Sequence, residues 1–477
     1  MTGGRAALVV VGDALLDRDL DGRAERLAPD APVPVVDDPA ELRRPGGAAL
    51  AATLAASFDG REVVLVTALA GDEAGSALRR LLELAGVEVA DLGLAGQTPE
   101  KIRVRADGRA LLRLDRATRP GTVGPLNRAG RRALEGAPAV LVADYGRGVA
   151  AEPRVRAALA ALPARRPLVW DPHPRGPAPV PGARLATPNR AEAAGFAAQV
   201  PGTGLAAVTA RARLLAERWA AAGVAVTLGP GGALLVEGAG APLVVPAPAA
   251  VGGDPCGAGD RFAVTAAGLL GDGALPSEAV AGAVAAAAAF VAAGGAATVR
   301  LDPAVPAPPG VPGTPASPPA GGDPLERALD LTAAVRASGG TVVATGGCFD
   351  LLHAGHVATL RSARALGDCL VVCLNSDDSV RRLKGPERPL VRQADRAAVL
   401  EALGCVDAVV PFDERTPEAV LRRLRPDVFA KGGDYALADL PESALLASWG
   451  GQAVVLPYLE GRSSTQLMKE VVRRDSH

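Results

Sequence analysis

A glycine-rich acidic loop is the clearest chemical pattern in the first 300 residues. Residues 254–260 read Asp-Pro-Cys-Gly-Ala-Gly-Asp and precede a long small-residue segment that predicts a helix. Gly257 and Gly259 allow the backbone to turn its N–H groups inward, and a helix N-terminus adds partial positive charge, so the loop can hold an anion. Asp260 would then be a base for a hydroxyl group that attacks a phosphoryl group. A plain glycine turn with Asp260 as helix N-cap is the competing interpretation.

A second loop places two histidines at the start of another expected helix. Residues 346–356 read Gly-Gly-Cys-Phe-Asp-Leu-Leu-His-Ala-Gly-His. His353 and His356 are three apart and share a helix face, and Gly355 leaves room for a phosphate. They could stabilise charge on an α-phosphoryl group while pyrophosphate is displaced. A metal pair is less favoured because no third ligand follows at ligand spacing. Buried core histidines are the other alternative, but two of the four histidines in the chain fall here.

Short apolar runs separated by helical segments must position both loops. Continuous apolar runs of this kind predict parallel strands covered on both faces, and ligands in such sheets bind at the carboxyl ends of the strands. We therefore expect an α/β fold with mainly parallel sheets. The expected strands are Leu8–Val11, Val63–Thr67, Val140–Ala143, Leu168–Trp170, Val224–Leu228, Val342–Thr345, Cys369–Leu374, Ala408–Val410 and Val428–Ala430.

A proline-rich segment divides the chain. Residues 302–324 read DPAVPAPPGVPGTPASPPAGGDP and carry no periodic apolar pattern, which is typical of a semi-extended linker. The 477 residues exceed what one core usually supports. We expect domains at 1–301 and 325–477, joined by a linker at 302–324.

Composition limits the classes of partner. The 51 basic and 52 acidic residues give a net charge of -1, which argues against a broad surface for nucleic acid or anionic lipid. The first apolar run is too short for a signal sequence, and the stretch Ala279–Val299, rich in Ala and Gly, favours a buried helix over a membrane span. The five cysteines lack metal-type spacing and are interpreted as reduced thiols. A cytoplasmic protein without membrane or nucleic-acid partners is expected.

The N-terminal motifs are similar to those of ribokinase-type sugar kinases over roughly residues 5–300. The resemblance rests on the Gly-Ala-Gly-Asp loop at 257–260, and on Gly12-Asp-Ala-Leu-Leu-Asp17, Ala31–Val35 and Arg44-Pro-Gly-Gly-Ala-Ala49, which look like the heptose 7-phosphate kinase branch. It implies Asp260 as the catalytic base. It also implies sugar-binding roles for Asp13, Asp17, Gly46, Gly47, Lys101 and Asp144, and nucleotide-binding roles for Asn189, Glu192, Thr227, Gly229, Gly257 and Gly259.

Three positions depart from that family. Leu50 stands where the family usually has Asn, His173 stands where relatives carry Lys, and Cys256 replaces a loop Thr. A kinase site depends on placed charge more than on covalent chemistry, so the loss of peripheral donors is expected to slow the reaction or change its sugar rather than abolish it.

The C-terminal loop resembles the HxGH signature of cytidylyltransferase-like nucleotidyltransferases, with similarity over about residues 340–470. That resemblance implies transfer of a nucleotidyl group without a covalent enzyme intermediate, with His353 and His356 as catalytic residues. A solvated surface is the ordinary role for Lys and Arg, but lysine is scarce in this chain. The phosphate- and nucleotide-binding residues implied are Gly347, Phe349, Lys384, Arg388, Lys431, Ser464 and Thr465.

The order of the two halves resembles the bifunctional heptose kinase/adenylyltransferase family. That resemblance implies phosphorylation of D-glycero-D-manno-heptose 7-phosphate at C1, adenylyl transfer from ATP to heptose 1-phosphate, Mg²⁺ with ATP, a separate heptose bisphosphate phosphatase and a homodimer through the kinase domain. Three alternatives stay open. The N-terminal half could be a degenerate sugar-binding or dimerising module, both halves could act on another sugar phosphate, or the chain could be a non-catalytic scaffold.

Overall fold

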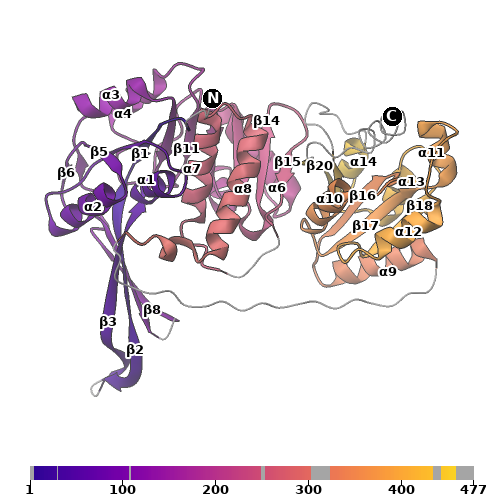
Figure 1. Cartoon of the computed structure of the whole chain (residues 1–477), viewed down its shortest axis with the longest axis horizontal. Helices are drawn as coiled ribbons and strands as arrows, with labels where there is room; N and C mark the ends of the chain where they lie inside the picture. The colour runs from indigo at the N-terminus through magenta and orange to yellow at the C-terminus, as the bar shows by residue number, and fades with distance from the viewer. Residues whose placement is uncertain are drawn as a thin grey trace, which may run out of the picture. The chain divides into compact units, whose positions relative to one another are not determined.

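The computed structural model describes residues 5–28, 31–106, 109–248, 253–301, 323–432 and 442–457 (Figure 1). The chain forms two compact units. The first contains residues 1–198, 212–227 and 251–309, and the second contains residues 199–211, 228–250 and 310–477. Most of the expected linker, residues 302–322, lies outside the described residues. The proposed domain limits at 301 and 325 stay a prediction.

A parallel sheet forms the centre of the first unit. Its order is β13-β12-β11-β10-β1-β4-β5, and each of these neighbouring pairs is parallel. The five strands expected before residue 300 are all present in this sheet, with ends that differ by one residue at most. The strands are β1 (Leu8–Gly12), β4 (Val63–Thr67), β5 (Val87–Asp91), β10 (Ala139–Ala143), β11 (Leu168–Asp171), β12 (Leu185–Ala186) and β13 (Gly223–Thr227).

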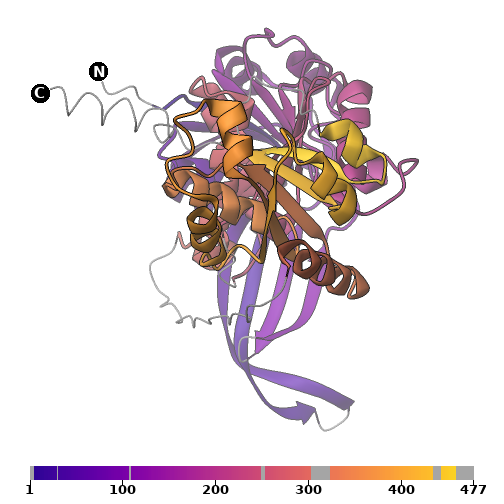
Figure 2. The ribbon, with the colours of Figure 1, turned by 90° about the vertical axis from the view of Figure 1, so that its right-hand side faces the viewer.

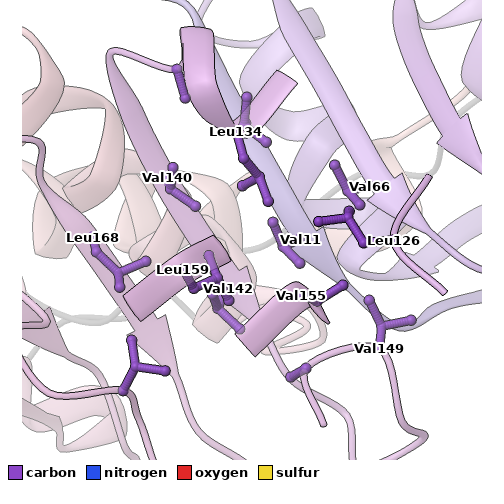
Figure 3. Close-up of a cluster of buried hydrophobic side chains, with 14 of the residues drawn as sticks. Val11, Val66, Leu126, Leu134, Val140, Val142, Val149, Val155, Leu159 and Leu168 are labelled. Carbon is purple, nitrogen blue, oxygen red and sulfur yellow. The ribbon is translucent and has the colours of Figure 1, made fainter. Parts of the chain in front are cut away.

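Helices cover both faces of this sheet. Val11 of β1 packs in one apolar cluster with Leu134 and Leu159, which come from the helices on one face (Figure 3). Val10, which points to the opposite face, is also fully buried. Both faces are therefore dry, as the continuous apolar strands predicted. The helices are α1 (Ala48–Ser57), α2 (Glu73–Leu84), α3 (Arg128–Gly136), α4 (Pro153–Ala160), α5 (Arg190–Phe196), α6 (Leu205–Trp219), α7 (Ala258–Gly271), α8 (Pro276–Ala292) and the 3₁₀ turns η1 (Gly229–Gly231) and η2 (Gly295–Thr298).

A separate four-stranded sheet extends away from the main sheet of this unit (Figures 1 and 2). Its order is β3-β2-β7-β8, with β2 antiparallel to β3 and parallel to β7. The sequence analysis did not predict it, because β2 is rich in charged residues and lacks a continuous apolar run. The strands are β2 (Ala14–Ala28), β3 (Ala31–Gly47), β7 (Glu100–Ala106) and β8 (Arg109–Arg116); β6 (Leu94–Ala95) pairs with β9 (Thr122–Val123).

The second unit contains a parallel sheet of order β18-β17-β16-β19-β20. Its core includes Val371, Leu421 and Phe429. The unit also contains an antiparallel hairpin of β14 (Ala233–Glu237) and β15 (Leu243–Val245). The sheet strands are β16 (Val342–Gly347), β17 (Cys369–Asn375), β18 (Ala408–Phe412), β19 (Val428–Gly432) and β20 (Gln452–Leu456), and the helices are α9 (Pro324–Ala337), α10 (Ala354–Arg364), α11 (Asp377–Lys384), α12 (Gln393–Glu401), α13 (Glu418–Leu424) and α14 (Ser443–Ala447).

The stretch Ala279–Val299 is helical for most of its length, in α8 and η2. Among the residues that the structure describes, no helix combines the length and the apolar character needed to cross a membrane. All five cysteines are unpaired, and Cys369 and Cys373 are buried in β17 as the strand prediction required.

Candidate active sites

The acidic loop at 254–260 leads directly into α7, and its shape depends on Gly257. Gly257 is the N-cap of α7 and has φ +80°, in the left-handed region that favours glycine. A Cβ at this position would lie 2.9 Å from Cδ2 of Leu50. Leu50 is buried at 2 % exposure, so the residue that departs from the kinase pattern packs beneath the loop. The leucine supports the anion hole by apolar contact and offers no hydrogen bond to a sugar.

Asp260 lies in the first turn of α7 and is 8 % exposed. Tyr145 donates its hydroxyl hydrogen to Oδ1 of Asp260 at 2.6 Å. Burial raises the pKa of Asp260 to about 7, although the Tyr145 hydrogen bond and the charge of Lys101 act in the opposite direction. A carboxylate that titrates near neutral pH is suited to accept a proton from a hydroxyl group. Tyr145 directly follows Asp144 in the chain, and sequence reasoning assigned it no role.

Asp13 organises the loop that carries Tyr145. Its two carboxylate oxygens accept hydrogen bonds from the backbone N–H groups of Tyr145, Arg147 and Val149 at 2.9–3.1 Å. Asp13 is 3 % exposed. These contacts give it a positioning role, and its predicted contact with sugar stays a prediction.

Asp17 and the Gly46–Gly47 pair lie together at the base of the four-stranded sheet. A Cβ on Gly46 would be 2.6 Å from Oδ2 of Asp17, so only glycine allows this approach. Arg103 of β7 donates to Asp17 at 3.0 Å and to Sγ of Cys256 at 3.7 Å. Arg103 thereby joins the sheet to the acidic loop, a role that sequence reasoning missed because basic residues alternate along β7.

Lys101 and His173 both lie close to the ring of Tyr145. The Nζ atom of Lys101 is 5.4 Å from the centroid of the Tyr145 ring, and the His173 ring stacks on Tyr145 with centroids 6.4 Å apart. Asp144 accepts a hydrogen bond from the N–H of Gly146 at 2.8 Å, and burial raises its pKa to about 7. The structure therefore gathers the predicted sugar-binding residues around Tyr145.

The predicted nucleotide-binding residues follow β12 and β13. Asn189 and Glu192 form a reciprocal capping box at the start of α5, with hydrogen bonds of 2.8 and 2.9 Å. Asn189 also forms an isolated parallel bridge with Thr227, and Gly229 follows with φ +62°. These contacts show local structural roles. Binding of Mg-ATP by these four residues stays a prediction.

Asp171 is a further buried carboxyl group at the end of β11. It accepts a hydrogen bond from the Thr187 hydroxyl at 2.9 Å. Burial raises its pKa well above the usual range, and the charges of Asp260 and Glu192 add to that effect. Asp171 therefore lies within electrostatic reach of both the candidate base and the nucleotide motif. Its position after an apolar strand was visible in the sequence, but turn chemistry explained it equally well.

The two histidines of the second unit meet at the N-terminus of α10. His353 is the N-cap, and its Nδ1 accepts from the N–H of Gly355 at 3.1 Å. The His353 and His356 ring centroids are 4.0 Å apart, and the Phe349 ring is 5.4 Å from that of His356. Phe349 has φ +45°, and its ring lies against Gly347, where a Cβ would be 3.1 Å from Cε2.

His356 is neutral at physiological pH. Burial, together with the charges of His353 and Lys384, lowers its pKa to about 4. A neutral imidazole carries one N–H group and can donate one hydrogen bond. Lys384, the exposed last residue of α11, therefore lies within electrostatic reach of His356.

A buried arginine network holds the rest of this loop. Arg396, 2 % exposed, donates to the carbonyl oxygens of Cys348 and Asn375 and to Asp377. Asp350 accepts from Arg388 and from two backbone N–H groups, which lowers the pKa of Asp350 despite its burial. Sequence reasoning missed Arg396, because nothing in the sequence separates one buried arginine from the exposed ones around it.

The remaining predicted phosphate contacts differ in how far the structure describes them. Lys431 is the next-to-last residue of β19, and its Nζ lies 3.4 Å from the buried carboxylate of Glu442. The pairing of Arg388 with Asp350 leaves other N–H groups of the guanidinium free to donate. Ser464 and Thr465, like residues 433–435 after Lys431, lie outside the described residues.

Each half of the chain matches a known protein family. Residues 5–302 match the pfkB family of carbohydrate kinases, and residues 344–464 match the cytidylyltransferase-like family. The chain is therefore an enzyme that combines a carbohydrate kinase with a nucleotidyltransferase, and its fold is a ribokinase-like α/β domain followed by a Rossmann-like one.

Full-length relatives give the particular family. The chain is 60 % identical over 473 residues to the bifunctional protein HldE of Streptomyces coelicolor, covering 97 % of this chain and 96 % of that protein. It is 40 % identical to the protein of the same name from Halorhodospira halophila, covering 98 % and 97 %, and 39 % identical to that from Caulobacter sp., covering 97 % and 95 %. The chain belongs to the bifunctional HldE family.

Proposed function

We propose that the first unit phosphorylates D-glycero-D-manno-heptose 7-phosphate at C1, using ATP. The observation that carries this proposal is Asp260, a buried carboxyl group with a pKa of about 7 that lies at the N-terminus of α7. The C1 hydroxyl gives its proton to Asp260 as its oxygen attacks the γ-phosphorus, and ADP leaves. Backbone N–H groups of the 257–259 loop hold the charge of the transferring phosphoryl group.

Mg²⁺ enters as part of the Mg-ATP substrate. Oxygen donors suit this ion, and the carboxyl group of Glu192 lies near enough to Asp171 for its charge to raise the pKa of Asp171. A bound cation would favour their ionised forms and so reverse the effect of burial. We therefore assign these two residues to the metal side of the nucleotide and Asp260 to the sugar side.

The second unit, in the same proposal, transfers an adenylyl group from ATP to heptose 1-phosphate. An oxygen of the sugar phosphate attacks the α-phosphorus, and pyrophosphate leaves in line without a covalent enzyme intermediate. His353 and His356 donate hydrogen bonds to the α-phosphoryl oxygens, and Lys384 adds positive charge beside them. The products are ADP-heptose and pyrophosphate.

The experiment compares wild-type protein with Asp260→Ala and His356→Ala. Each protein is given Mg-ATP with heptose 7-phosphate or with heptose 1-phosphate, and ADP, pyrophosphate and ADP-heptose are measured. We expect Asp260→Ala to lose ADP formation and keep pyrophosphate formation. We expect His356→Ala to lose pyrophosphate formation and keep ADP formation. Each variant is the control for the other, because it keeps one activity and so shows that the chain is folded. Formation of ADP by the Asp260 variant at the wild-type rate would refute the assignment.

A second candidate is a first unit that binds sugar without phosphorylating it. The buried apolar side chain of Leu50 favours this alternative, since it removes one polar contact beside Gly257. Wild-type protein that forms pyrophosphate from heptose 1-phosphate, but no ADP from any heptose phosphate, would support it.

We also propose a homodimer formed through the first unit. Leu111, Leu112 and Leu114 of the edge strand β8 are 41, 54 and 44 % exposed, and exposed apolar edge strands pair readily with another chain. The Leu112→Glu change is expected to convert a dimer into a monomer in light scattering, whereas Leu84→Glu, at a leucine of α2 that is 66 % exposed, leaves the mass unchanged. A wild-type monomer would exclude the dimer.

The cellular setting follows from the same chemistry. ATP as a substrate and five unpaired cysteines fit the cytoplasm. The kinase product carries two phosphates whereas the transferase acceptor carries one, so a separate heptose bisphosphate phosphatase must act between the two reactions.

A further inference from the structure

A cavity of about 650 Å³ in the first unit lies beside the loop that follows β10. Gly146 and Gly176 belong to its wall, and a Cβ on either residue would collide with His173 or Asp144, so only glycine fits at these positions. The two basic side chains of the wall are Arg147 and Arg175. A concave site with two guanidinium groups is suited to a small anion.

The positive charge of this cavity is balanced in part by the longer-range attraction of Asp13 and Asp115 for Arg147. Within the described parts of the chain, neither Arg147 nor Arg175 forms an ion pair; Arg147 donates one hydrogen bond, to the carbonyl oxygen of Ala117 at 2.7 Å. Burial lowers the pKa of Arg147 and the charge of Arg175 adds to this, against the attraction of Asp13. Both remain charged, because guanidinium groups do not lose their proton in proteins.

The only carboxylate in the described wall of the cavity is already engaged. Glu152 is the N-cap of α4 and accepts from the N–H of Val155 at 2.7 Å. His173, at the kinase position where relatives carry Lys, is held uncharged because burial and the charge of Arg175 lower its pKa. Its Nδ1 accepts the backbone N–H of Arg175 at 3.2 Å, which fixes the turn that carries this arginine.

The cavity and the catalytic base are joined by one residue. Tyr145 bonds to Asp260 through its hydroxyl group, and the next residue, Gly146, lines the cavity. Asp13 fixes the backbone of Tyr145 and Arg147 through two of its hydrogen bonds. Asp260 is therefore connected to the cavity wall through the side chain of Tyr145 and the peptide bond to Gly146.

We propose that Arg147 and Arg175 bind the phosphate group that the sugar substrate already carries, at the end of the sugar opposite the hydroxyl that is phosphorylated. This inference rests on the proposed kinase function and deepens it. Arginine is matched to phosphate by its fork of N–H donors. The subsite makes the enzyme selective for a phosphorylated sugar and places its free C1 hydroxyl at Asp260.

The test measures binding without ATP. Calorimetric dissociation constants are determined for heptose 7-phosphate, unphosphorylated heptose and inorganic phosphate with wild type, Arg175→Gln, Arg147→Gln and Arg147→Lys. Arg165→Gln is the matched control, since Arg165 is exposed and lies outside the cavity. Loss of one charged hydrogen-bonding partner is expected to weaken heptose 7-phosphate binding by about 10- to 100-fold and to leave unphosphorylated heptose within about twofold. Arg147→Lys should recover part of the loss.

Each outcome decides the proposal. Equal losses for both sugars would show a structural role and overturn it, as would unchanged binding in both glutamine variants. Inorganic phosphate that binds without competing with heptose 7-phosphate would show an anion site separate from the sugar, which also overturns it. Failure of the kinase proposal is recognised separately, because it appears as absent ADP formation by wild type, whereas the subsite is judged from binding alone. If Arg147→Gln is unfolded, Arg175→Gln decides, since Arg175 is exposed and makes no side-chain hydrogen bond within the described residues.

Discussion

At the scale of single residues, the first site contains carboxyl groups whose pKa is raised by burial. A raised pKa lowers the cost of burying such a group, because the group is partly protonated near neutral pH. Asp144 and Asp260 both have a pKa of about 7, and in both the largest cause is burial. Only Asp260 has a hydroxyl partner, Tyr145, and a place at a helix N-terminus. The two groups therefore share a titration range but differ in their capacity to act as a base.

The first prediction concerns the pH dependence of the kinase reaction. Because the pKa of Asp260 is raised to about 7, its carboxyl group is protonated and inactive as a base below that pH. We expect kcat/KM for ADP formation to rise about tenfold per pH unit below 7 and to level off above it. Asp144→Asn is the control and should keep this limb, although its own carboxyl group titrates in the same range. If the acidic limb of kcat/KM disappeared in Asp144→Asn, the group that titrates would be Asp144 rather than Asp260.

The second prediction concerns His356. Since its pKa is lowered to about 4, the imidazole stays neutral and pyrophosphate formation should show no loss from its protonation between pH 8 and 6. His356→Ala should lower kcat by roughly 100- to 1000-fold, the usual effect of removing one preplaced hydrogen-bond donor. His173→Ala, in the other unit, should leave pyrophosphate formation unchanged. An acidic limb centred near pH 6.5 that vanishes in His356→Ala would show that the histidine acts as a cation.

The residue types of two glycine-containing loops were enough to select Asp260 and the histidine pair as candidates. Such loops at helix starts have a direct chemical meaning, because they can hold an anion. Tyr145, Arg103 and Arg396 were not found. Each acts through a partner that is distant in sequence, and such partners are known only when the fold brings them together: Asp260 is 115 residues from Tyr145, and Cys256 is 153 residues from Arg103.

At the scale of elements, α7 is set by its two glycine ends. Gly257 at its start and Gly273 just after its end both have a left-handed backbone, with φ +80° and +95°. A Cβ at Gly257 would meet Leu50 at 2.9 Å and Phe290 at 3.2 Å, whereas nothing lies within 4 Å of one at Gly273. Alanine would therefore strain the backbone at both positions. Only at Gly257, beside the active site, would its Cβ also clash with neighbouring side chains.

The third prediction follows from that difference. Gly257→Ala and Gly273→Ala should each lose about 1–2 kcal/mol of stability from the left-handed backbone. Only Gly257→Ala should also lose kinase activity, by at least about tenfold, because the loop must shift away from Leu50. Denaturant unfolding and ADP formation measure the two effects. Equal kinase activity in the two variants would mean that the position of the loop does not limit phosphoryl transfer.

The sequence pattern predicted the buried parallel strands but not the projecting sheet, because the prediction depended on continuous apolar runs. Strands such as β10 and β17 are buried along their whole length, so each reads as an unbroken apolar run. In β2 and β3, charged residues form ion pairs within the sheet, such as Arg44 with Asp19, so the hydrophobic pattern is lost. The motifs at both ends of β2–β3 were identified for their chemistry while the strands between them were not.

At the scale of the whole molecule, two phosphate chemistries are combined in one chain but do not follow one another directly. The first unit adds a phosphate at C1 of a sugar that already carries one, and the proposed arginine subsite explains why that second phosphate is required there. The second unit accepts a sugar with a phosphate at C1. Its candidate residues are His353, His356 and Lys384, which we assign to the α-phosphoryl group rather than to the far end of a sugar.

The fourth prediction tests this break in the sequence of reactions. Full-length protein supplied with Mg-ATP and heptose 7-phosphate should accumulate ADP and a heptose bisphosphate, with no pyrophosphate or ADP-heptose. Addition of a phosphatase that removes the 7-phosphate should start release of pyrophosphate in proportion to the phosphate freed. Asp260→Ala should block both products, but pyrophosphate should return when heptose 1-phosphate is supplied. Pyrophosphate formed without phosphatase would instead mean that the second unit accepts the bisphosphate, and that the same chain can complete both transfers unaided.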